Sequence, residues 1–133
     1  MSYAVNPLKQ ITVFESKART ASANSSDQNN FGYRGVTLNL KAASKTGTSP
    51  TLDVKVQGKD PVTGEYFDIH GAAFAQVTDN QTAPVYLTIY PGVAETSGQT
   101  VSDVLPKTWR VVTTIGGSAT PGYTFSVSAT LLP

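Results

Sequence analysis

The chain has 133 residues, a net charge of +1 and charged side chains at 14%, and it contains no cysteine. This length suits a single domain that can bury a core without the help of a metal, and the lack of cysteine excludes a disulfide framework and a cysteine-ligated zinc site. Since the ten Lys and Arg residues are scattered singly, with no block to neutralise a row of phosphates, nucleic-acid binding is not expected.

Apolar and polar residues alternate with a period of two along most of the chain, which is typical of strands with one buried and one exposed face. Residues 1–10 break this pattern and are predicted to form an N-terminal arm, followed by one domain over 11–133. Residues 21–30 are polar and aperiodic, which favours an exposed loop. In chain order, the predicted strands cover 11–14, 36–41, 52–57, 66–69, 85–90, 109–115 and 123–131.

Two hairpins are predicted from turn residues. Asp60 and Pro61 favour the start of a turn and Gly64 allows a positive φ, so the segment 58–65 is expected to join its two flanking strands. The glycine-rich segment 116–122 is expected to join the strands on either side of it in the same way. The long connection 93–105 is predicted to hold one helical turn at 102–105.

Several short strands separated by turn signals predict an all-β fold, a single-domain β-sandwich. The pattern does not decide between a jelly-roll and an immunoglobulin-like topology. Both ends of the chain, including Leu131–Pro133, are candidates for extended terminal arms. No apolar run approaches the roughly 20 residues of a membrane helix, and the opening residues do not form a secretory signal.

The chain's single tryptophan, Trp109, is followed directly by Arg110. Neighbours on a strand point to opposite faces, so these two side chains are not expected to form one compact site. Trp109 shares its face with Val111 and Thr113, which predicts a place in the core. Arg110 is then outward, and arginine is a frequent anchor in protein interfaces, so Arg110 is a candidate interface residue.

The sequence does not predict a group of residues that could act together in catalysis. The single histidine, His70, is predicted to end a strand, where an ordinary surface role is the more frequent one. Carboxylate pairs can be drawn between residues 60 and 65 and between Asp53 and Asp68, but a turn cap and a solvated cross-strand charge pattern explain them better. We therefore predict no catalytic residue, no cofactor, no metal ligand and no enzyme activity.

Tyr86, Thr88 and Tyr90 share one face of a predicted strand. Exposed aromatic rings in this arrangement could stack on a sugar. Tyrosine is also common in strands and enriched in protein interfaces. The pattern leaves both interpretations open, and Tyr86 and Tyr90 are candidate interface residues in either case.

The stretches "QGKDPVTGEY" and "LPKTWRV", together with 36–40 and 87–92, resemble a group of small virion proteins of tailed bacteriophages. This resemblance extends over about 11–131 and implies a head decoration, or cement, protein. Such a protein would be made in the host cytoplasm and bind the major capsid protein on the outer head surface as a homotrimer. The alternatives are a tail-associated structural domain and a carbohydrate-binding module for host attachment.

Overall fold

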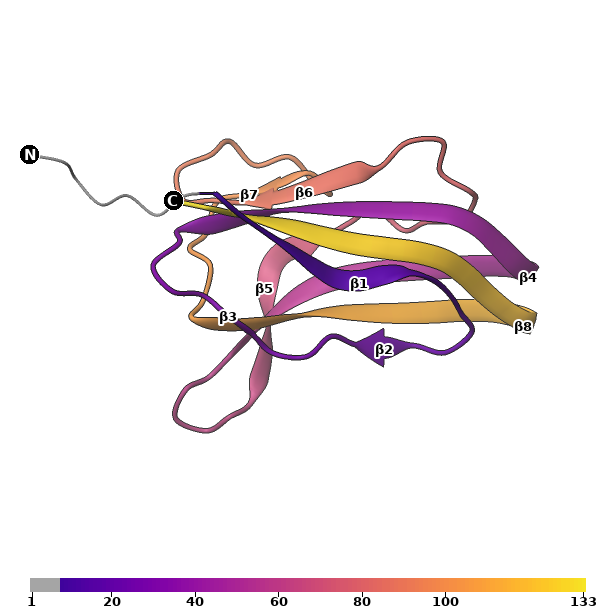
Figure 1. Cartoon of the computed structure of the whole chain (residues 1–133), viewed down its shortest axis with the longest axis horizontal. Coiled ribbons are helices and arrows are strands. Elements are labelled where there is room, and N and C mark those ends of the chain that lie inside the picture. The colour runs from indigo at the N-terminus through magenta and orange to yellow at the C-terminus, as the bar shows by residue number, and fades with distance from the viewer. Residues whose placement is uncertain (1–7) are drawn as a thin grey trace, which may run out of the picture.

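The computed structural model describes residues 8–133, in which the regular elements are strands (Figure 1). They form one mixed, open sheet with the order β1-β8-β4-β6-β7, while β2 and β3 pair with β8 and β5 pairs with β4. All pairings are antiparallel except β6 with β7. The predicted all-β class is therefore confirmed. The strands are β1 (Lys9–Arg19), β2 (Ala23–Asn24), β3 (Gln28–Asn29), β4 (Gly35–Lys59), β5 (Tyr66–Ala73), β6 (Val85–Ile89), β7 (Thr100–Val101) and β8 (Thr108–Leu132).

Strands β4 and β8 are long and sharply bent, and they pair with each other on both sides of their bends. Figure 1 shows both ribbons turning at the same end of the molecule. Gly47 and Gly117 lie in these bends with φ values of 90° and 121°, a region that glycine enters without steric cost. We call this end of the molecule the bend end.

The predicted hairpin around 116–122 is wrong. The segments 109–116 and 122–132 pair with β4, and the intervening Ser118 pairs with Thr48. Both segments thus belong to one strand that bends beside its neighbour. Glycine and proline mark a hairpin turn and a strand bend in the same way, so the local signal could not separate the two. The other hairpin is confirmed, because Gly58 pairs with Phe67 across β4 and β5.

The bends fold the sheet back so that the apolar faces of its two halves enclose one core. The alternation seen in the sequence is also seen in burial, with every second residue of β4 and β8 buried on both sides of the bend. Trp109 is fully buried, and Val111 and Thr113 are buried on the same face, which confirms the prediction for the indole ring. Burial of this ring is worth roughly 4–5 kcal/mol of gross transfer free energy.

Several boundaries differ from the sequence prediction. Strand β1 starts at Lys9, inside the predicted arm 1–10, and residues 1–7 of that arm lie outside the described residues. The segment 21–30 is not a simple exposed loop, because β2 and β3 line the edge of β8 and Ser25 and Asn30 are buried. The connection 93–105 contains β7, and residues 102–105 form no helical turn.

Candidate functional site

Arg110 projects from β8 on the face opposite to Trp109, as predicted, and stacks on an aromatic ring. Its guanidinium carbon lies 3.4 Å from the ring centroid of Tyr66, and its Nε donates a hydrogen bond of 2.9 Å to Oε1 of Gln57. A guanidinium over a tyrosine ring is a favourable cation–π contact. Arg110 is half-buried and held by neighbours of its own chain, and its role in an interface stays a prediction.

Asp27 and Lys59 continue this polar network on the outer face of the sheet. The Tyr66 hydroxyl donates a 2.7 Å hydrogen bond to Asp27, and the Lys59 ammonium approaches the same carboxylate at 2.9 Å. The hydrogen bond from Tyr66, followed by the one from Lys59, lowers the pKa of Asp27 below its usual value of 3.8. The network connects β4, β5 and β8 with Asp27, the residue before β3, and Asp27 and Lys59 also line an open hollow of about 710 Å³ beside the hairpin tip.

The lowered pKa of Asp27 predicts a loss of stability in acid. A carboxyl group whose pKa is lower in the folded state stabilises the protein above its unfolded pKa, and that stability is lost as the pH falls through the folded pKa. We expect the free energy of unfolding, measured by urea titration, to decline as the pH drops below about 4. Asp27→Asn and Tyr66→Phe should each flatten part of this decline. An unchanged pH dependence in both variants would show that the network contributes nothing.

The candidate acid–base residues form no hydrogen bond or ion pair with one another within 8–133, although His70 and Asp68 line one shallow hollow of about 300 Å³. His70 is exposed and shares a shallow hollow of about 340 Å³ with Glu95. Asp53 accepts hydrogen bonds from Gln76, whereas Asp68 accepts them from Gln57 and Lys55. Within 8–133, no three His, Cys, Asp or Glu side chains gather as metal ligands would.

The turn between β4 and β5 shows why residues 60 and 65 need no catalytic role. The Asp60 carboxylate accepts hydrogen bonds from the backbone N–H groups of Val62 and Thr63, at 2.8 Å and 3.3 Å. These bonds lower the pKa of Asp60. The predicted turn cap is therefore present, and it sets the shape of a hairpin tip that extends beyond the sheet (Figure 1).

The two tyrosines of the proposed sugar platform lie in different surroundings. Tyr86 is half exposed and lines a groove of about 440 Å³ at the start of β6. Tyr90 does not line that groove, and its hydroxyl donates a hydrogen bond of 2.9 Å to the carbonyl oxygen of Pro133. Between them, the Thr88 hydroxyl is bonded to the Thr37 hydroxyl at 2.9 Å. Only one of the two tyrosine rings, that of Tyr86, therefore lines the groove.

The exposed large apolar side chains fall into two groups. Val85 and Tyr86 line the groove. The other group lies at the end of the molecule away from the bends, which we call the loop end. Its members flank the start of β1, both ends of β4 and β8, and the start of β5. The members of this second group are Leu8, Phe31, Val62, Phe67 and Val104.

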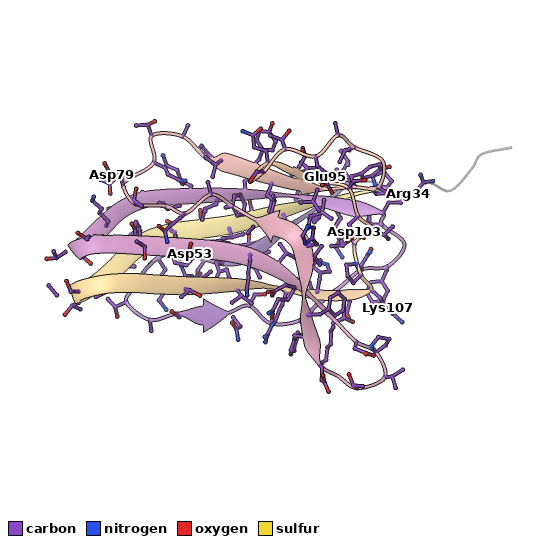
Figure 2. All side chains as sticks on the ribbon, turned by 180° about the vertical axis from the view of Figure 1, so that it is seen from behind. Arg34, Asp53, Asp79, Glu95, Asp103 and Lys107 are labelled. Carbon is purple, nitrogen blue, oxygen red and sulfur yellow. The ribbon has the colours of Figure 1, made fainter. Side chains whose placement is uncertain are left out.

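Asn30 holds the two central loops of the loop end together. This buried side chain donates hydrogen bonds to the carbonyl oxygens of Tyr33 and Leu105, at 2.7 Å and 3.1 Å, and accepts one of 2.8 Å from the Tyr33 N–H. The Leu105 N–H also donates to the Arg34 carbonyl at 2.9 Å. Figure 2 shows Arg34, Asp103 and Lys107 at this end of the molecule. The loops that carry Phe31 and Val104 are therefore fixed to each other.

The loop end was missed in the sequence because its apolar residues belong to no alternating pattern. Phe31 follows a polar segment, Val62 sits inside a turn, and Val104 lies in a long connection. Only Phe67 is on a predicted strand. The available signal was that each of the others is an apolar side chain surrounded by turn-forming residues, which has no obvious place in a core.

No family model, curated protein or solved structure matches the chain. The resemblance to phage virion proteins consequently stays a prediction. Within 8–133, the chain forms no helix with the length and apolar character needed to cross a bilayer.

Proposed function

We propose that this protein is a structural protein of a phage particle that decorates the outer surface of the head and stabilises it. The observation that carries the proposal is that five exposed large apolar side chains lie at the loop end. Their burial against the major capsid protein would be worth about 1.5–3 kcal/mol for each fully covered side chain. The polar, hydrogen-bonded outer face around Tyr66 would remain in solvent.

We further propose that the two halves of the folded sheet are the layers of a β-sandwich, with a jelly-roll or an immunoglobulin-like topology. The shared core supports this arrangement. Such a body is a stiff spacer, since β4 and β8 run through both layers and pair with each other along most of their length. A rigid domain that presents exposed apolar side chains at one end suits attachment to a shell.

The homotrimer is part of the same proposal. A trimer with three loop ends engages several capsid subunits together, so a modest contact for each copy becomes tight by multivalency. Attachment to the phage tail would use the same surface, and labelling of intact particles distinguishes head from tail.

Charge placed at the loop end should weaken capsid binding. Val62 is 90% exposed and Val104 is 57% exposed, so Val62→Asp with Val104→Asp should leave the fold intact. Because a carboxylate buried in an apolar interface is strongly unfavourable, we expect capsid affinity to fall at least about tenfold. Co-sedimentation with expanded capsids measures the loss.

The matched control is Ser44→Asp with Ser118→Asp, which places two carboxylates on exposed positions near the bends of β4 and β8. This variant should sediment with capsids like the unsubstituted protein. Equal binding of the loop-end variant and the control would remove the loop end as the attachment surface. Failure of the unsubstituted protein to sediment with any head preparation would remove the head decoration proposal itself.

A further inference from the structure

The groove beside Tyr86 lies between the start of β6 and the segment that follows β5. Its volume is about 440 Å³ and Asp79 is its only charged lining residue. That carboxylate is paired with Lys45 at 3.1 Å. The walls are otherwise apolar or carry hydroxyl and amide groups, so the groove suits an uncharged occupant.

One wall of the groove offers unpaired strand backbone. The N–H groups of Thr88 and Tyr90 point away from β4, since they donate to Gln99 and Val101 on the β7 side, at 2.7 Å and 3.0 Å. Alternate residues of a strand direct their N–H and C=O groups to the same side. Tyr86 therefore directs both groups to that side as well. Strand β7 begins to pair with β6 only at Thr88, so within 8–133 no strand meets Tyr86 there.

The opposite wall is formed by the segment that follows β5. Phe74 and Val77 donate their N–H groups to Val54 and Leu52, at 3.0 Å and 2.9 Å. Between them, Ala75 and Gln76 make no main-chain to main-chain hydrogen bond with any described residue. Gly98 packs closely against Ala75, so the open backbone for an extended segment is the Tyr86 side of the groove, and peptides add to sheet edges of this kind.

We propose that this groove binds residues 2–7 of a second copy of the chain as an added strand. This segment, SYAVNP, carries no charge and matches the groove in that respect. In an extended conformation Tyr3 and Val5 point to one side and Ala4 to the other. The segment leads directly into β1 at Lys9, so its attachment to the folded body is short.

The geometry favours a second copy over the chain's own segment. Lys9, Leu131, Val36 and Ile89 form one row across β1, β8, β4 and β6. With strand spacings of about 4.8 Å, an added strand at Tyr86 lies about 22 Å from Lys9. When fully extended, the chain from Ala4 to Lys9 reaches about 18 Å and the chain from Ser2 to Lys9 about 25 Å, so only the first residue of the segment could lie beside Tyr86 of its own copy.

The direction of entry also opposes pairing within one copy. Strand β1 runs from the loop end toward the bends, because Lys9 pairs with Leu131 and Arg19 with Tyr123. Leu8 therefore enters β1 from the loop end, whereas Tyr86 lies on the bend side of the row that contains Ile89. A contact of one copy's segment with another copy's groove is heterologous, and it closes into a ring when the rotation between copies allows.

This inference rests on the homotrimer of the proposed function and names the contact that would hold it together. Its tests use the protein without capsids, so a negative result is distinguishable from a failure of capsid binding. Since the chain has no cysteine, single cysteines report the contact cleanly. One preparation carries the substitution Val5→Cys. The other carries Ser97→Cys, at a position that lines the groove. We expect mild oxidation of the mixture to yield mixed disulfide dimers. In the control mixture, the second preparation carries Ser128→Cys, at an exposed position outside the groove. The yield of mixed disulfide dimers should then be at least about tenfold lower.

The backbone contact has its own test. Tyr86→Pro removes the N–H that points into the groove, and proline is tolerated in edge strands where that group makes no ladder bond. Tyr86→Ala keeps the N–H. In light scattering we expect oligomers for the unsubstituted protein and for Tyr86→Ala, but monomers for Tyr86→Pro and for a chain that lacks residues 2–7.

Two results would overturn the inference. The first is a truncated chain that associates as strongly as the full chain. The second is a disulfide that closes within a chain carrying both cysteines while the mixture of single-cysteine chains stays monomeric, because the segment would then occupy its own groove. The cysteine result stands even if Tyr86→Pro disturbs the fold.

Discussion

Trp109→Ala is expected to destabilise the protein by about 3–5 kcal/mol, the range for removing a large aromatic side chain from a packed core. The ring is fully buried at the start of β8, where the long bent strands meet the loop end. Since small domains have a free energy of unfolding of about 5–15 kcal/mol, much of the population should unfold at moderate urea concentrations. Circular dichroism during urea titration measures the change.

Trp109→Phe is the matched control. The indole Nε1 is buried without a hydrogen-bond partner among the described residues, and such a group costs free energy in the folded state. Phenylalanine removes this donor while it keeps most of the apolar contact, so its cost should be well below that of alanine. If phenylalanine were as destabilising as alanine, ring packing would not be the source of the stability.

Asn30→Ala is expected to destabilise the protein by about 2–3 kcal/mol and to weaken capsid binding as well. The substitution removes three hydrogen bonds in a buried position, and each bond of this kind contributes about 0.5–1.5 kcal/mol, or more when a buried partner is left unsatisfied. The loops of Phe31 and Val104 would lose the side chain that joins them. Urea titration and co-sedimentation measure the two effects.

Asn29→Ala is the adjacent control, because Asn29 is exposed in β3. Its free energy of unfolding should stay within about 0.5 kcal/mol of the unsubstituted protein. Asn30→Ala with full stability and full capsid binding would contradict the role of this side chain at the loop end.

The strands were predictable because alternation is a local property. The runs around Val54, Leu87 and Phe125 have one apolar face each, and in the structure those faces are buried except at Val85, the first residue of β6. The continuity of β4 and β8 through their bends was not predictable. It depends on which residues pair across the sheet, such as Thr48 with Ser118, and no local pattern records such pairing.

The surfaces were predictable only in part. The outward direction of Arg110 followed from alternation, yet its stacking on Tyr66 depends on the distant pairing of β4 with β5 and β8. The exposure of Tyr86 also agrees with the alternating pattern. The groove beside it requires that β7 begin at Thr100 and that residues 74–79 cross nearby, and neither feature has a sequence signal.

We propose two separate kinds of contact for the loop end and the groove. The loop end presents apolar side chains on fixed loops, which suits a surface of another protein. The groove presents unpaired backbone, which suits an extended segment. Together they describe a domain that could join its own copies through the groove and hold a shell through the loop end.

An electron-microscopy map of phage heads incubated with the protein tests the central claim most directly. We expect density on the outside of the shell, with the end that carries Phe31, Val62 and Val104 against the capsid and the bends of β4 and β8 pointing outward. Heads without added density, or domains attached through the bend end, would contradict the account.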